Sequence, residues 1–239
     1  MKNIPNLITS FNLASGFAAV IFASSGDMVT ASWLIIAAMI FDFFDGFTAR
    51  MIRAYSAVGK ELDSLADVVS FGVAPGIIIY NLLRNSFSAG APADIDADYL
   101  NTFLIIAVSA VMPVCAALRL AIFNLDDSQA TSFRGMPTPA NALAVISVVI
   151  AAHYSQSPVI IAFSGSAVLL VIFAFLLSVL MVSRLPLLSL KMSDLKLKGN
   201  EGRYIMLGLI AAAFLIGGIA AAPLVIPIYI LSSMVSLAF

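Results

Sequence analysis

Four aspartates beside apolar stretches are the residues best suited to chemistry in this sequence. Asp42 and Asp45 lie in DFFDGFTAR, directly after the apolar run SWLIIAAMIF, and Asp63 and Asp67 lie in GKELDSLAD, directly before another apolar run. An aspartate at the centre of a membrane helix costs about 2.5–3.5 kcal/mol, so carboxylates inside such helices suggest a functional site. Each aspartate taken alone is equally compatible with a position in water beside a membrane span.

Helical spacing groups the four aspartates with small residues. If the helix that precedes Asp42 continues to Arg50, residues three and four apart lie on one face. The same rule applies to the helix that contains Asp63, and the short turn at 51–58 allows the two faces to meet. Small residues on these faces let a ligand approach the backbone closely. The two faces consist of Asp42, Asp45, Gly46 and Ala49, and of Gly59, Asp63, Asp67 and Ser70.

Four carboxylates that lie close together repel each other unless a cation neutralises them. Ligands that are all oxygen favour Mg²⁺ or Mn²⁺ over zinc. Two such ions, roughly 3.5–4 Å apart, are a known arrangement for displacement at phosphorus. We therefore expect the four aspartates to hold divalent metal, with two ions as the favoured number.

The composition places these aspartates in a membrane protein. Hydrophobic residues make up 62% of the 239 residues and charged residues only 10%, whereas about a quarter of a soluble domain is charged. The apolar residues form long runs, which are typical of membrane-spanning helices. The net charge of −1 gives no indication of a nucleic-acid partner. Cys115 is the single cysteine, which excludes an intrachain disulfide and a cysteine-based metal site. We predict eight spans, at about 6–25, 28–47, 63–86, 98–122, 139–154, 158–182, 203–220 and 223–238.

The basic residues give an orientation to these spans. Eleven of the twelve Lys and Arg residues fall on one side of the predicted topology, and only Arg84 falls on the other. Loops that retain positive charge are cytoplasmic. We expect a multi-pass protein of the cytoplasmic membrane whose two termini and both aspartate stretches face the cytoplasm.

The pattern D-x2-D-G-x2-A-R-x8-G-x3-D-x3-D, from Asp42 to Asp67, resembles the complete signature of the CDP-alcohol phosphatidyltransferase family. The resemblance implies an all-α integral membrane enzyme with a six-helix core that often forms a homodimer. Such an enzyme transfers a phosphatidyl or related group from a CDP-linked donor to an alcohol and releases CMP. We expect residues 1–185 to form the core, and residues 186–239 to add a cytoplasmic loop and two extra spans.

Carried over position by position, the signature implies roles for individual residues. Asp42, Asp45 and Asp63 would bind metal, and Asp67 would bind the second metal and take the proton from the acceptor hydroxyl. For Arg50 an anchoring role at the membrane surface is an equal alternative. The implied contacts of the donor nucleotide are Gly46, Ala49, Arg50, Gly59 and Ser70.

Four further stretches resemble the phosphatidylserine synthase branch of this family over roughly residues 3–185: IPNLITSFNLASG, DSLADVVSFGVAPG, ALRLAIFNLD and FRGMPTPANA. The branch uses CDP-diacylglycerol and L-serine. One departure is Ile122, where the branch commonly has a basic residue. In the last stretch, Thr138 and Pro139 fit a helix N-cap and a first-turn proline.

The serine carboxylate needs a cation, and arginine is its best partner because it donates two parallel hydrogen bonds. Arg119 and Arg134 are the two candidates, with Arg119 preferred because it ends a span near the depth of Asp67. An anchoring role at the interface is the alternative for Arg119.

Two other functions remain open from the sequence. A related enzyme would use glycerol phosphate or inositol phosphate as the acceptor, and would need more basic residues for the added negative charge. A membrane transporter would use the carboxylates as ion sites, but transporter sites usually lie near the middle of the membrane. CMP release separates the enzymes from the transporter.

Overall fold

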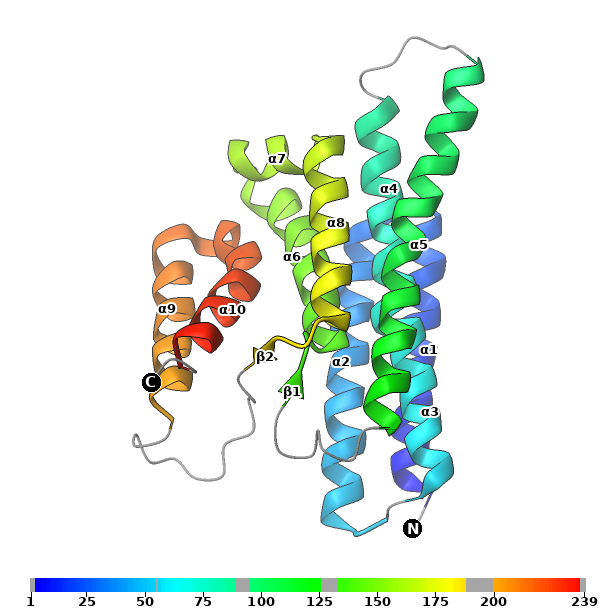
Figure 1. The fold of residues 1–239 in the computed structure, drawn as a ribbon, viewed down its shortest axis with the longest axis vertical. Helices are drawn as coiled ribbons and strands as arrows, with labels where there is room; N and C mark the ends of the chain where they lie inside the picture. Colours follow the sequence, from blue (N-terminus) through cyan, green and yellow to red (C-terminus); the bar gives the residue numbers. More distant parts are fainter. Residues whose placement is uncertain (1–2, 55, 89–94, 126–132, 188–199, 237–239) are drawn as a thin grey trace.

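The computed structural model describes residues 3–54, 56–88, 95–125, 133–187 and 200–236. Over these residues the chain is a bundle of helices with one short pairing of two-residue strands (Figure 1). The all-α membrane architecture predicted from the sequence is therefore confirmed. The elements are α1 (Ile4–Ser24), α2 (Met28–Met51), α3 (Ala57–Asp67), the π-helix η1 (Val68–Val73), α4 (Ala74–Ser88), α5 (Ile95–Leu125), β1 (Phe133–Arg134), α6 (Thr138–Ser155), α7 (Pro158–Ser164), α8 (Ala167–Val182), β2 (Pro186–Leu187), α9 (Glu201–Gly217), the 3₁₀-helix η3 (Gly218–Leu224) and α10 (Val225–Ser236).

In the described part of the chain, six helical stretches are long and apolar enough to cross a membrane. A seventh is added if α7 and α8, which are bent by 79° at their junction, are taken as one span. The last stretch, Glu201–Val235, contains both of the last two predicted segments. Its helices α9 and α10 pack against each other as a hairpin (Figure 1). Within the described residues, each of the eight predicted segments thus coincides with one or more helices.

Local capping fixes the helices that carry the aspartates. Asp27 precedes α2, and its carboxylate accepts a hydrogen bond from the Thr30 N–H at 3.0 Å. Ser56 precedes α3, and its hydroxyl accepts from the Gly59 N–H at 2.9 Å. Such caps satisfy N–H groups that the first turn leaves unpaired. Because α2 continues to Met51, its last three turns present the predicted face of carboxylates and small residues.

Small residues allow the helices of the bundle to pack closely. Helix α1 packs along α2, where Ala19, Ala23 and Ala38 are fully buried. Helix α5 packs against η1, where a Cβ added at Gly72 would lie 3.0 Å from the Cβ of Ala116. Close approach through small residues is the usual way in which membrane helices associate. Helix α1 also packs against η1, so α1, α2, η1 and α5 form one closely packed unit.

A π-helix follows Asp67 directly, at Val68–Val73. The Asn141 side-chain amide of α6 donates a hydrogen bond to the Phe71 carbonyl at 3.4 Å. Short π-helical turns inside α-helices frequently occur at functional sites. The π-helix lies directly between Asp67 and the start of α4. Pro75 is the second residue of α4.

The strands β1 and β2 pair antiparallel and join the start of α6 to the end of α8. The Gly135 N–H donates to the Leu185 carbonyl at 2.9 Å, and the Met136 N–H donates to the Leu180 carbonyl at 2.9 Å. Gly135 has φ +76°, and a Cβ there would lie 2.5 Å from the Met181 carbonyl oxygen. Glycine is therefore required at this turn. This pairing was not predicted from the sequence.

Candidate active site

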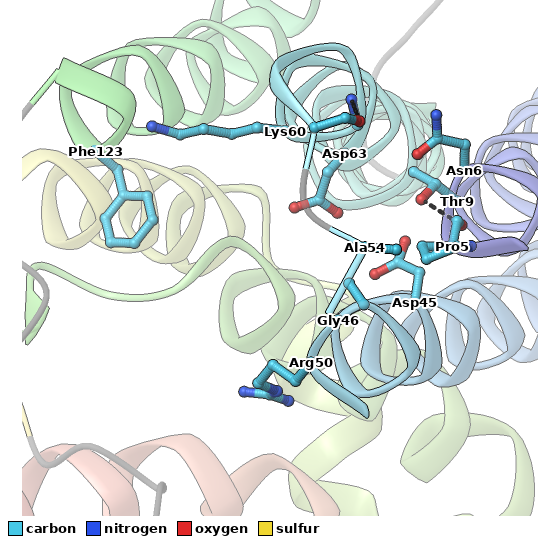
Figure 2. Close-up of a pocket in the computed structure, with 13 residues that line it drawn as sticks. Pro5, Asn6, Thr9, Asp45, Gly46, Arg50, Ala54, Lys60, Asp63 and Phe123 are labelled. Atoms are coloured by element: carbon cyan, nitrogen blue, oxygen red, sulfur yellow. Dashed lines mark hydrogen bonds between the residues drawn. The ribbon is translucent and has the colours of Figure 1, made fainter. Parts of the chain in front are cut away.

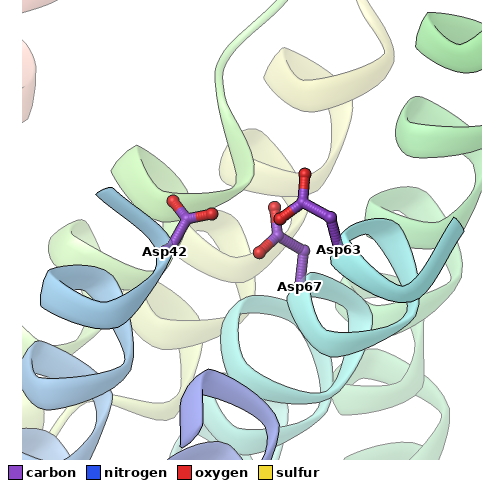
Figure 3. Close-up of side chains that lie close together, drawn as sticks. All are labelled: Asp42, Asp63 and Asp67. Atoms are coloured by element: carbon purple, nitrogen blue, oxygen red, sulfur yellow. The ribbon is translucent and has the colours of Figure 1, made fainter. Parts of the chain in front are cut away.

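Asp42 of α2 and Asp63 and Asp67 of α3 form one acidic group. Each offers a carboxylate oxygen, and these three oxygens lie within 4.8 Å of one another. Figure 3 shows the three side chains directed toward the same point between the two helices. The faces predicted from the helical spacing therefore meet, and three of the four aspartates contribute to one potential metal site.

The fourth aspartate, Asp45, lies beside this acidic group and lines a cavity of about 440 Å³. Asp63 also lines the cavity, so it belongs both to the acidic group and to the cavity wall. Figure 2 shows the carboxylates of Asp45 and Asp63 directed into the same space between α2 and α3. The volume is in the range of small-molecule sites. Four of the five residues predicted to contact a nucleotide also line it: Gly46, Ala49, Arg50 and Gly59.

Ser70, the fifth residue predicted to contact a nucleotide, is fully buried and does not line this cavity. Its hydroxyl donates a hydrogen bond to the Asn12 carbonyl of α1 at 3.1 Å. It lies directly against Gly16, where no side chain would fit. In the structure Ser70 therefore joins η1 to α1.

Helix α1 supplies site residues that were not predicted from the sequence. The Asn12 side-chain amide donates to Asp67 Oδ1 at 3.3 Å, and both residues are buried. Asn6 and Thr9 line the cavity with Asp45. A signal was present, because Asn6, Thr9 and Asn12 follow one another at steps of three on one helical face.

Arg119 of α5 is only 9% exposed, and its guanidinium interacts electrostatically with Asp67. It also lies 5.8 Å from the ring centroid of Phe123, within the range of a cation–π contact. Arg134 lies in β1, but its side chain is outside the described part of the structure. Of the two arginines considered for serine, the structure places Arg119 near Asp67.

Unpartnered oxygens test whether these residues suit a metal. Asp45 Oδ2 and Asp63 Oδ1 are buried and have no hydrogen-bond partner among the described residues. A buried oxygen without a partner is unfavourable, and a divalent cation would provide one. The donors are all carboxylate oxygens, which suits Mg²⁺ or Mn²⁺. The residues present therefore fit a divalent metal.

Fold and site together define a class. The chain is a multi-pass membrane protein whose acidic group of Asp42, Asp63 and Asp67 lies between α2 and α3 (Figure 3), beside a cavity of ligand size. The model of the CDP-alcohol phosphatidyltransferase family matches residues 2–183, which is most of the chain. The protein belongs to the CDP-alcohol phosphatidyltransferase family.

Named relatives refine this comparison. A CDP-diacylglycerol–serine O-phosphatidyltransferase of Helicobacter pylori is 35% identical over 207 residues, which cover 84% of this chain and 77% of the relative. The protein of the same name from Bacillus subtilis is 34% identical over 185 residues, covering 77% of this chain and 89% of the relative. An archaetidylserine synthase of Methanothermobacter thermautotrophicus is 33% identical over 155 residues, covering 64% of this chain and 60% of the relative. The first two matches extend over most of both chains.

Proposed function

We propose that this protein transfers a phosphatidyl group from CDP-diacylglycerol to the hydroxyl of L-serine, giving phosphatidylserine and CMP. The observation that carries the proposal is the acidic group of Asp42, Asp63 and Asp67 beside a cavity, in a chain of this family. Relatives named for the serine reaction match most of the chain. The further division into a core at 1–185 and an addition at 186–239, and assembly as a homodimer, are part of the same proposal.

In the proposed reaction, Asp67 accepts the proton of the serine hydroxyl. The hydroxyl oxygen attacks the lipid-side phosphorus of CDP-diacylglycerol, and a new P–O bond forms. The P–O bond of the diphosphate breaks, and CMP leaves with the electron pair. A buried carboxylate held by Asn12 at 3.3 Å has the fixed position that a general base needs. Divalent ions, two of Mg²⁺ or Mn²⁺ bound by the four aspartates, would neutralise charge on the diphosphate.

The cavity suits the nucleotide part of the donor. Gly46, Ala49 and Gly59 line it with almost no side chain, so the diphosphate can approach the backbone of α2 and α3. A Cβ at Gly59 would lie 2.8 Å from Asn6 Oδ1, so a larger residue there would close the gap between α3 and α1. Arg50 lines the same cavity and can pair with phosphate oxygens.

The choice of acceptor is tested directly with purified protein. CDP-diacylglycerol and Mn²⁺ or Mg²⁺ are supplied with serine, glycerol phosphate, inositol or inositol phosphate in separate reactions. We expect CMP release with serine alone. CMP release with only one of the other acceptors would make the protein a different transferase of the family, and ion flux without any CMP release would support a transporter.

The proposal places the active site and both termini in the cytoplasm, because eleven of the twelve basic residues fall on that side of the predicted topology. A single cysteine at Ala93→Cys, in a chain with Cys115→Ala, should react with a membrane-impermeant maleimide on intact cells. The matched variant Ser193→Cys should react only after permeabilisation. The opposite labelling pattern would invert the orientation.

A further inference from the structure

Four buried polar side chains outside the acidic group have atoms without hydrogen-bond partners. Among the described residues these atoms are Asn12 Oδ1, Arg119 Nε, Thr138 Oγ1 and Asn141 Oδ1. None of the four residues is more than 9% exposed. Unpartnered buried polar atoms are few in native proteins, because each costs free energy. Four of them from three different helices suggest a ligand that would supply the missing partners.

Helix packing places Arg119 at the depth of Asp67. Gly72 of η1 faces Ala116 of α5, where a Cβ added at Gly72 would lie 3.0 Å from the Ala116 Cβ, and η1 and α5 run in opposite directions (Figure 1). Arg119 lies about one turn after Ala116, and Asp67 lies about one π-helical turn before Gly72. Both steps lead toward the same end of the bundle. The electrostatic interaction between Arg119 and Asp67 agrees with this placement.

Helix packing places Thr138 at a similar depth. Asn141 of α6 contacts the Phe71 carbonyl, which lies four residues after Asp67. Helix α6 runs in the same direction as η1 and α4 (Figure 1), and Thr138 is one turn before Asn141 on the same face. The expectation that Thr138 is an N-cap is wrong. Pro137 occupies the N-cap, and Thr138 begins the helix with a hydroxyl that caps nothing.

Asn12 completes this arrangement from α1. Its amide nitrogen is used by Asp67 Oδ1, whereas its oxygen has no partner. Asn12 contacts Asp67 itself, and Asn141 contacts the Phe71 carbonyl in the next turn. Thr138 lies one turn before Asn141 on α6. These three side chains each have an oxygen able to accept a hydrogen bond. The guanidinium of Arg119 adds one cation. A set of acceptors with a cation is complementary to a small molecule that carries both an ammonium and a carboxylate.

We propose that Asn12, Thr138 and Asn141, together with Arg119, form the subsite for a zwitterionic amino-acid acceptor. This inference rests on the proposed function. The ammonium has three N–H donors, which would bind the three side-chain oxygens. The carboxylate binds Arg119, and the hydroxyl faces Asp67. A phosphorylated polyol has no ammonium to donate to these oxygens, so the same residues select serine over that class of acceptor.

Thr138→Val tests this subsite, because valine keeps the shape of threonine and removes the oxygen. We expect the KM for serine to rise roughly tenfold while the KM for CDP-diacylglycerol is unchanged. Thr138→Ser keeps the hydroxyl and should retain the wild-type KM. The control is Ser147→Ala on the same helix, whose hydroxyl binds the Ala144 carbonyl at 2.7 Å, and it should change neither constant.

Two serine analogues separate the two halves of the subsite. Ethanolamine lacks the carboxylate, and 3-hydroxypropanoate lacks the ammonium. Thr138→Val removes a contact of the ammonium, so it should lower the ratio of kcat/KM for serine to that for 3-hydroxypropanoate. Arg119→Gln removes the contact of the carboxylate, so it should lower the ratio of kcat/KM for serine to that for ethanolamine. If Thr138→Val does not accumulate in membranes, Thr138→Ala removes the same oxygen with a smaller side chain and is measured in its place.

The results distinguish this inference from the proposed function. If the wild-type protein releases CMP with serine but neither Thr138→Val nor Thr138→Ala changes the KM for serine or the analogue preferences, the subsite is wrong and the function stands. A raised KM for CDP-diacylglycerol with serine unchanged would also overturn the subsite, by placing Thr138 at the donor. If the wild-type protein does not use serine, both the function and the subsite fail.

Discussion

The Asp67→Asn variant is expected to fold, to bind CDP-diacylglycerol and to release CMP roughly 10²–10⁴ times more slowly than the wild type, the range typical for loss of a general base. Asparagine has the size of aspartate but cannot accept the proton of the acceptor hydroxyl. Its side-chain oxygen can still accept the hydrogen bond that Asn12 donates to Asp67 Oδ1. The substitution should therefore leave the packing of α1 against α3 intact and affect mainly the chemical step.

Single-turnover CMP release at saturating metal and serine measures this effect, alongside binding of labelled CDP-diacylglycerol. Asp27→Asn is the matched control, because Asp27 lies at the other end of α2 and caps it through the Thr30 N–H. Hydrogen bonds from Thr30 lower the pKa of Asp27, so the control also removes a carboxylate charge. Asparagine is an equally good cap, and we expect near-wild-type turnover. Similar rates for Asp67→Asn and Asp27→Asn would mean that another group takes the proton.

The faces that carry the aspartates could be predicted because helical spacing is a local property. Residues three or four apart share a face in any helix, and α2 does continue to Met51, as that prediction required. The rotation of α2 about its axis relative to α3 is not local. It brings Asp42 to Asp63 and Asp67 and directs Asp45 to the cavity. The sequence therefore predicted four carboxylates in one region but could not divide them between two environments.

The contribution of α1 was missed for a related reason. Asn12 and Asp67 are 55 residues apart in the chain, and their contact depends on how α1 packs against α3. A polar residue in an apolar helix can equally bind its own backbone, as Thr9 does through the Pro5 carbonyl at 3.0 Å. Asn12 has no such local contact, and only the structure shows which of the two alternatives each residue takes.

Irregular elements were the least predictable part of the fold. The strands β1 and β2 contain two residues each, so neither has a periodic pattern, and their pairing depends on where α6 and α8 bring them. The π-helix at Val68–Val73 likewise has no distinct spacing in the sequence. The position of Thr138 differed from the expectation by one residue, a typical uncertainty for a helix end. That one residue changes the interpretation of its hydroxyl from a cap to a potential ligand contact.

Asp63→Asn is expected to impair both metal activation and donor binding, and to do so more than Asp45→Asn. Asp63 belongs to the acidic group and also lines the cavity, and its Oδ1 has no hydrogen-bond partner among the described residues. Asp45 lines the cavity but is not part of the acidic group. Loss of a residue that only supports a metal ligand typically weakens metal binding about 10–100-fold. Loss of a ligand itself should cost at least as much, so we expect the Mn²⁺ concentration for half-maximal CMP release to rise at least about tenfold.

The measurement is a titration of CMP release with Mn²⁺ at saturating serine, repeated at several concentrations of CDP-diacylglycerol. Glu61→Gln is the control on the same helix, because Glu61 is exposed and lies outside both the acidic group and the cavity lining. It loses one carboxylate charge, as Asp63→Asn does, and should leave the titration unchanged. An unchanged Mn²⁺ titration for Asp63→Asn would remove Asp63 from the metal site. A shifted titration in Asp63→Asn with a normal one in Glu61→Gln would show that the position of the carboxylate, and not the net charge of α3, determines metal binding.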